Sequence, residues 1–108
     1  MEKRLYEILI ALDPAVLSTD ADALMARLGQ QIADSGGEVK SLEKHGLRKL
    51  AYRVKGKTEA NFFQFTCEAP PGMVQQVKQI LRLHEGILRS MTTKIDPQFI
   101  SQSGAAGK

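Results

Sequence analysis

The sequence predicts an α+β fold in which a four-stranded antiparallel sheet carries two helices on one face, connected as a split β-α-β plait. Strand-like runs and helical stripes of apolar residues follow one another in the order strand, helix, strand, strand, helix, strand. Each helix must pack on a sheet, and right-handed crossovers leave one compact arrangement for this order. The 108 residues, 43% hydrophobic and 25% charged, suit one domain with a modest core. We place this domain at residues 1–96 and a mobile tail at residues 97–108, where glycine, serine and alanine dominate.

The first strand and first helix are bounded by clear signals. A strand is predicted at residues 5–12, and Asp13-Pro14 ends it. Ser18 or Thr19 is the expected N-cap of the helix, which ends at Gly36-Gly37. The strand should bury Tyr6, Ile8, Ile10 and Leu12, and the helix should bury Leu24, Met25, Leu28 and Ile32.

The second strand is predicted to be irregular. Val39 and Leu42 lie three residues apart, so both cannot face one side of a regular strand. A bulge or bend is therefore expected, with Gly46 as the candidate position. Strand character resumes at residues 47–55, and a turn is predicted at residues 56–59.

The third strand, the second helix and the last strand complete the plait. The third strand is predicted at residues 61–68, with Phe62 on the outward face. Pro70-Pro71-Gly72 opens the second helix and Gly86 closes it. The last strand is predicted at residues 87–95, and its blurred alternation leaves its faces unassigned. The inward residues are expected to be Phe63, Phe65 and Cys67 of the strand, and Met73, Val74, Val77, Ile80, Leu81 and His84 of the helix.

Positive charge is concentrated in residues 44–57. This segment holds six of the 15 Lys and Arg residues and no acidic one, while the whole chain has net charge +3. The rest of the chain holds nine basic and twelve acidic residues, so without this segment the net charge would be negative. The concentration indicates a surface prepared for a polyanion, and the alternative is a solvated hairpin edge whose lysines discourage strand pairing.

Alternation divides the basic segment into two rows. The row predicted to be buried consists of Leu50, Tyr52 and Val54, with the tip of Tyr52 at the rim. The opposite row joins the sheet face that the helices leave open. That open face is predicted to include Leu9, Lys49, Arg53, Lys55 and Phe62. Aromatic and aliphatic residues beside cations suit nucleic acid or a basic partner better than a metabolite.

The residues that catalysis or metal binding would need are not grouped in the sequence. His45 and His84 lie 39 residues apart, and Cys67 is the only cysteine. The carboxylates are scattered, and Gly36-Gly37 follows a helix, whereas a phosphate loop precedes one. We therefore expect no enzymatic activity, no metal and no cofactor. No membrane-spanning or targeting segment is expected either, and the chain reads as a protein of a reducing compartment.

Five short motifs give the chain a family resemblance. It is similar to the bacterial-type small-subunit ribosomal protein six family over residues 5–96. The motifs are Tyr6-Glu7-Ile8, Gly37-Glu38-Val39, Gly46-Leu47-Arg48-Lys49-Leu50-Ala51-Tyr52, Glu68-Ala69-Pro70 and Leu88-Arg89-Ser90-Met91.

The resemblance implies a ferredoxin-like fold and a structural role in the small ribosomal subunit. It implies binding to the central domain of small-subunit ribosomal RNA, as a heterodimer with small-subunit ribosomal protein eighteen, and no small-molecule substrate. Arg53 departs from the family pattern, which often has proline there, and hints at an organellar relative; the expected location is a bacterial or organellar ribosome. The residues expected to bind RNA or partner are Arg4, Arg48, Lys49, Arg53, Lys55, Phe62, Arg82 and Arg89.

Two other functions remain open from the sequence. A stand-alone single-strand RNA-binding module would need two or three aromatic residues on the outward face, where only Phe62 is expected. A regulatory domain that binds a small molecule would need glycines and polar groups after the first strand, and residues 13–17 lack them.

Overall fold

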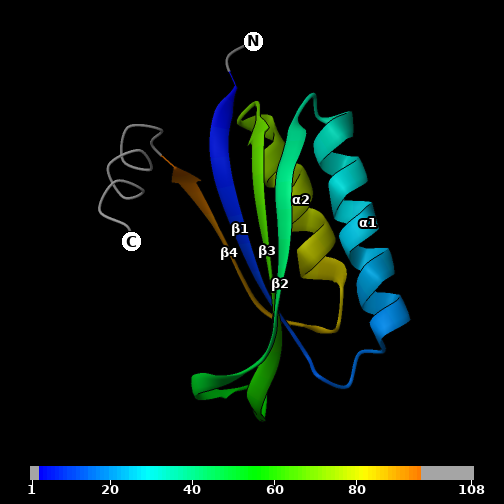
Figure 1. Ribbon diagram of the computed structural model, residues 1–108, viewed down its shortest axis with the longest axis vertical. Helices are drawn as coiled ribbons and strands as arrows, with labels where there is room; N and C mark the ends of the chain where they lie inside the picture. The colour runs from blue at the N-terminus through cyan, green and yellow to red at the C-terminus, as the bar shows by residue number, and fades with distance from the viewer. Residues whose placement is uncertain (1–2, 96–108) are drawn as a thin grey trace.

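The computed structural model describes residues 3–95, and it confirms the predicted plait (Figure 1). A four-stranded sheet has the order β2-β3-β1-β4, with every neighbouring pair antiparallel. Both helices lie on one face of this sheet. The predicted tail at residues 97–108, with residue 96, lies outside the described residues. The elements are β1 (Arg4–Leu12), α1 (Ser18–Asp34), β2 (Glu38–Val54), β3 (Lys57–Ala69), α2 (Gly72–Leu83) and β4 (Ile87–Ile95).

The main core lies between the sheet and the helices. Every apolar residue predicted to be inward in β1, β3 and α1 is buried there, and α2 adds a stripe at helical spacing. Val74 and Ile80 pack on this core from its margin, while His84 is half-buried at the C-cap of α2. Burial raises the pKa of the Cys67 thiol to about 11, so this cysteine is a protonated, apolar core residue at neutral pH. The stripe of α2 consists of Met73, Val77 and Leu81.

The first helix begins one residue earlier than predicted. Its N-cap is Leu17, whose carbonyl accepts the first helical hydrogen bond from Ala21, and no side chain caps this end. The prediction of Ser18 or Thr19 as the N-cap is therefore wrong. The preceding loop is ordered instead by Asp13, whose carboxylate accepts a hydrogen bond from the Ala15 amide at 2.9 Å.

The β2–β3 hairpin turns earlier than predicted. Lys55 and Gly56 have φ of +50° and +78°, and Val54 pairs with Lys57. A two-residue turn with two left-handed residues matches the twist of antiparallel strands. The turn predicted at residues 56–59 is therefore wrong, and β3 begins at Lys57.

The second strand bends as the spacing of its apolar residues predicted. The register between β2 and β3 shifts between Val39 and Ser41 and between Lys44 and Gly46, and Gly46 has φ of +79°. Beyond this point β2 and β3 leave the body of the sheet and pair only with each other (Figure 1). We call residues 47–60 the hairpin arm.

The predicted burial of Tyr52 is wrong. Its side chain is 60% exposed, and Leu50 and Val54 pack on a small cluster made by Ala11 and Leu88 with Ala60, not on the main core. The register shift between Lys44 and Gly46 is the cause, because Gly46 then pairs with the outward Phe62 and Arg48 with Ala60. Leu50 and Tyr52 follow on the same side and lie over the open face of the sheet.

Gly37, in the connection between α1 and β2, lies close to the end of β3. A Cβ atom there would lie 2.5 Å from Cβ of Ala69 and 2.9 Å from the carbonyl oxygen of Glu68. Because the obstacle includes backbone, Gly37→Ala should lower the free energy of unfolding by about 1–3 kcal/mol, measured by urea denaturation. Gly72→Ala is the matched control, since nothing lies within 4 Å of its added methyl. Equal stability of the two variants would contradict the close approach.

Candidate functional site

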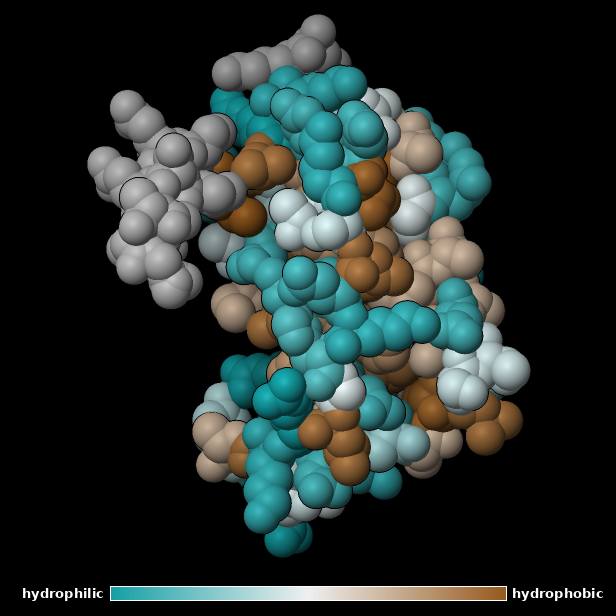
Figure 2. Space-filling view, in the orientation of Figure 1, coloured by the Kyte–Doolittle hydropathy of each residue, from teal (hydrophilic) through white to brown (hydrophobic). Residues whose placement is uncertain are grey.

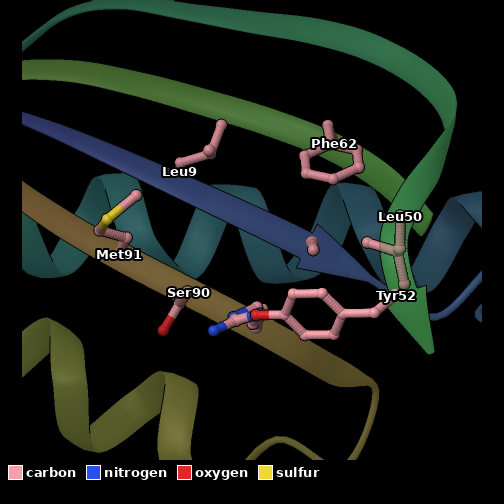
Figure 3. A pocket seen from close by; sticks show the side chains of 8 residues that line it. Leu9, Leu50, Tyr52, Phe62, Ser90 and Met91 are labelled. Atoms are coloured by element: carbon pink, nitrogen blue, oxygen red, sulfur yellow. The ribbon is translucent and has the colours of Figure 1, made fainter. Parts of the chain in front are cut away.

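The open face of the sheet carries an apolar hollow of about 400 Å³, which we call the shelf (Figure 3). Strand alternation brings Leu9 of β1 and Phe62 of β3 to this face, and Met91 of β4 pairs with Leu9 in register. Leu50 and Tyr52 close the shelf from the hairpin arm. The predicted outward position of Phe62 is confirmed. The shelf is lined by Leu9, Ala11, Leu50, Tyr52, Phe62, Arg89, Ser90 and Met91.

Tyr52 and Arg89 join the hairpin arm to β4. The Nη1 atom of Arg89 donates a hydrogen bond to the Tyr52 hydroxyl, and its Cζ lies 5.3 Å from the centre of the Tyr52 ring. A guanidinium at this distance is attracted by the ring face. Both side chains stay accessible, with Tyr52 60% exposed. The pair therefore gives the shelf a rim that is aromatic and cationic.

A second hollow, of about 350 Å³, lies where α2 ends and β4 begins, and we call it the basic cleft. Lys55 enters it from the hairpin turn, where its Nζ donates a hydrogen bond to the Ile87 carbonyl at 3.0 Å. Arg82 lines the cleft from the last turn of α2 and Arg89 from β4. Three predicted site residues that are distant in sequence are thus brought together. The cleft is lined by Lys55, Lys78, Leu81, Arg82, His84, Ile87, Leu88, Arg89 and Ser90.

Arg48 and Lys49 form a separate group at the base of the hairpin arm. With His45 and Phe62 they line a shallow hollow of about 280 Å³. Nε of Arg48 donates a hydrogen bond to the His45 carbonyl at 3.0 Å, which directs the guanidinium back along β2. Phe62 lines both this hollow and the shelf, so the two hollows adjoin at this side chain.

Two predicted site residues stand apart from these groups. Arg53 is exposed on the hairpin arm, and its guanidinium has no hydrogen bond or ion pair with residues 3–95. Arg4 begins β1 and pairs with Ala69 in register, at the end of the sheet opposite the hairpin arm. Arg4 therefore does not share a surface with Arg48, Lys55 or Arg89.

At the end of the sheet opposite the hairpin arm, a lysine forms ion pairs with nearby glutamates. Lys40 lies 3.3 Å from Glu38 and 3.6 Å from Glu68, and the hydrogen bond with Glu38 raises the pKa of Lys40. In contrast, none of the cations of the basic cleft forms an ion pair with residues 3–95. The cations of the basic cleft are therefore left uncompensated by the carboxylates of residues 3–95. Figure 2 shows hydrophilic side chains at the lower end of this face, with hydrophobic ones among them.

The sequence prediction missed Lys78 and His84 as members of this surface. A signal for Lys78 was present, because Lys78 and Arg82 are four residues apart on the side of α2 away from its buried stripe. The helical spacing predicts an inward His84. It lies half-buried at the C-cap, where its Nδ1 accepts a hydrogen bond from the Gly86 amide at 3.1 Å.

Two features are absent from residues 3–95. Among residues 3–95, no three His, Cys, Asp or Glu side chains are grouped so that they could hold a metal ion. Neither helix in this range has the length and hydrophobicity of a segment that crosses a bilayer. The geometry supports binding surfaces: an apolar shelf, and groups of cations beside it.

Comparison with known proteins identifies the family. The sequence pattern of the family described as Ribosomal protein S6 matches residues 5–94. The chain is 31% identical over 96 residues to small ribosomal subunit protein bS6 of Koribacter versatilis, and the match covers 89% of this chain and 65% of that protein. It is 32% identical over 95 residues to the Acidobacterium capsulatum protein of the same name, covering 88% of this chain and 67% of that protein.

The fold comparison agrees with the sequence comparison. The crystal structure of 30S ribosomal protein S6 from Thermotoga maritima superimposes with a TM-score of 0.83 at 21% identity, covering 99% of this chain and 100% of that one. At this identity the likeness shows the ferredoxin-like fold. The chain spans about two thirds of the length of the two bS6 relatives named above. The match of the family pattern over residues 5–94 shows that this chain belongs to the ribosomal protein S6 family.

Proposed function

We propose that this chain is a structural constituent of the small ribosomal subunit that binds the central domain of its ribosomal RNA together with small-subunit ribosomal protein eighteen. One observation supports this proposal most strongly. The apolar shelf and the basic cleft adjoin across the start of β4, where Arg89 and Ser90 line both. A surface that is apolar on one side and cationic on the other suits a protein and a polyanion bound together.

The shelf is assigned to the protein partner. Interfaces between proteins are enriched in aromatic residues, methionine and arginine, and the shelf presents Tyr52, Phe62, Met91 and Arg89. The cations around the shelf are assigned to RNA phosphates, which give orientation and salt-dependent affinity without reading bases. These cations include Arg48, Lys49, Arg53, Lys55, Arg82 and Arg89, whereas Arg4 would need a separate contact at the far end.

A stand-alone single-strand RNA-binding module is less well supported. The structure does bring a second aromatic residue, Tyr52, to the open face beside Phe62. However, Arg89 already lies over the ring of Tyr52, and Phe62 is half-buried. Few aromatic faces on this surface are therefore free to stack with RNA bases. RNA binding should depend on protein eighteen. The relatives named above are bacterial, which favours a bacterial over an organellar ribosome.

Reconstitution tests the proposal. This chain, protein eighteen and a central-domain RNA fragment are mixed pairwise and together, and RNA affinity is measured at several salt concentrations. We expect weak binding by either protein alone and tight binding by the pair. No binding by the pair would contradict the proposal, and equally tight binding by this chain alone would favour the RNA-binding module. A rise in melting temperature with a metabolite, and none with RNA plus partner, would favour the regulatory domain.

A further inference from the structure

We infer that Asp13 and Lys57 are positioning residues for the shelf, because their ion pair holds the hairpin arm against the rest of the sheet. The inference rests on the proposed function, since it explains how the shelf is kept ready for its protein partner. Tyr52, one wall of the shelf, belongs to the arm, whereas Leu9 and Met91 belong to β1 and β4. The shelf is therefore complete only while the arm keeps its place.

Backbone pairing does not fix the arm in this place. Within residues 3–95, the two strands of the arm pair only with each other, and the pairing of β3 with β1 ends at Asn61. The arm departs from the rest of the sheet at Gly46, whose φ is +79°, and nothing lies within 4 Å of the place a Cβ atom would take there. Side-chain contacts must therefore set the angle between the arm and the sheet (Figure 1).

The ion pair between Lys57 and Asp13 is one such contact. Nζ of Lys57 lies 3.6 Å from Oδ1 of Asp13, where β1 passes into the loop before α1. The Asp13 side chain is only 22% exposed, so solvent screens this pair less than a pair on an open surface. Because β3 begins at Lys57, the pair ties the first residue of β3 to the end of β1.

Asp13 is a well-fixed anchor for this contact. Its amide donates a hydrogen bond to the Gly86 carbonyl at 2.8 Å, and its carbonyl accepts one from the Val16 amide at 3.0 Å. The carboxylate itself accepts a hydrogen bond from the Ala15 amide at 2.9 Å. A side chain oriented by its neighbours in this way holds its partner more closely than a free one does. Asp13 therefore gives Lys57 a defined place.

Two further contacts act on the same arm. Nζ of Lys55 donates a hydrogen bond to the Ile87 carbonyl at 3.0 Å, which joins the hairpin turn to the start of β4. Leu50 and Val54 pack on the small apolar cluster that includes Leu88. Together with the ion pair, these contacts reach the end of β1 and the start of β4, so they hold the arm from two sides.

A fixed arm matters for affinity because a loose wall of the shelf would have to be ordered during binding. Ordering a segment at an interface takes free energy from the association, whereas a preformed surface avoids that cost. Figure 3 shows Tyr52 reaching from β2 across the open face, where its ring depends on the position of the arm. Loss of the ion pair should therefore weaken partner binding although neither Asp13 nor Lys57 lines the shelf.

The experiment removes the ion pair from each side. Lys57→Gln removes the cation, and Asp13→Asn removes the negative charge but keeps an oxygen for the Ala15 amide. Each full-length variant is titrated calorimetrically with protein eighteen in the absence of RNA. Heteronuclear NOE values at the amides of residues 50–58 are measured on each variant alone. Both variants should bind about three- to fivefold more weakly, as expected for one such ion pair, and NOE values should fall only in the arm.

Two control variants separate positioning from the loss of a charge. Lys57→Arg keeps the cation and should restore both the affinity and the NOE values. Lys44→Gln breaks an ion pair with Asp22 at 3.2 Å, but Lys44 precedes the bend at Gly46. It should therefore leave the arm and the affinity unchanged. If Lys44→Gln weakens binding as much as Lys57→Gln does, the effect comes from charge alone and the inference is wrong.

The outcomes distinguish this inference from the proposed function. Unchanged NOE values in Lys57→Gln and Asp13→Asn would overturn the inference, whether or not protein eighteen binds. A loosened arm with undiminished affinity would overturn the positioning role and leave the proposed function standing. No binding of protein eighteen by the unmodified chain would overturn the proposed function and the positioning role together, while the NOE values would still decide whether the ion pair holds the arm.

Discussion

Tyr52→Ala should weaken binding of protein eighteen on the order of 30-fold while the protein stays folded. Exposed tyrosines at the centre of an interface commonly contribute about 2 kcal/mol or more, which corresponds to that factor. Tyr52 is 60% exposed, so its removal costs the isolated chain little, but it forms one wall of the shelf. The loss also releases Arg89 from its position at the rim. Calorimetric titration of the two proteins without RNA measures the effect.

Two control variants define what Tyr52 contributes. Leu17→Ala removes an apolar side chain that is 67% exposed before α1, away from the shelf, and should leave partner affinity unchanged. Tyr52→Phe keeps the ring and removes the hydroxyl that accepts the Arg89 hydrogen bond, so it should fall between Tyr52→Ala and the unmodified protein. If Leu17→Ala weakens binding as strongly as Tyr52→Ala, the shelf is not the partner site.

Phe65→Ala should cause the largest loss of stability among single substitutions in the sheet. Phe65 is 2% exposed at the centre of β3, opposite Ile8 of β1 in register. Truncating a buried phenylalanine costs about 3–5 kcal/mol, because the apolar contacts are lost and a cavity remains. The total free energy of unfolding of a small domain is only about 5–15 kcal/mol, so the variant should be close to unfolding. Urea denaturation followed by circular dichroism measures the loss.

Phe62→Ala is the matched comparison for this prediction. Phe62 is the same residue type on the same strand, three positions earlier, but it lies half-buried on the open face. Its truncation should cost about 1–2 kcal/mol and should act mainly on partner binding. Equal destabilisation by the two substitutions would contradict the assignment of the two faces of the sheet.

The local pattern of apolar residues predicted most of the fold, because most segments keep either the spacing of a helix or the alternation of a strand throughout. In β1, alternation alone separated the buried Ile8 and Ile10 from the outward Leu9. The prediction failed where pairing departs from a regular ladder. Alternation predicts a buried Tyr52 because the sequence does not show how the pairing of β2 shifts at Gly46, which depends on the partner strand. The alternation likewise predicts Lys55 in a strand, but Lys55 occupies a left-handed turn position with Gly56.

The candidate site was predictable as a list of residues but not as an arrangement. Charge counting singled out Lys55, and the family resemblance added Arg82 and Arg89, but their convergence depends on the hairpin arm folding toward the start of β4. The sequence does not single out Lys78, because a lysine on a helix is common. Its role in the site depends on the cations that lie near it in the fold. The sequence does not show either that Arg4 lies at the end of the sheet opposite the hairpin arm, away from the other predicted site residues.

The central claim is that this chain meets ribosomal RNA at the end of the sheet formed by the hairpin arm, α2 and β4, with protein eighteen on the adjoining shelf. Cross-linking in the reconstituted complex of both proteins and the central-domain RNA fragment, followed by mass spectrometry of the peptides, tests it most directly. The account predicts RNA adducts on peptides that contain Lys55, Lys78 or Arg82, and links from protein eighteen to residues near Tyr52. RNA adducts confined to α1 or to the Arg4 end of the sheet would contradict it.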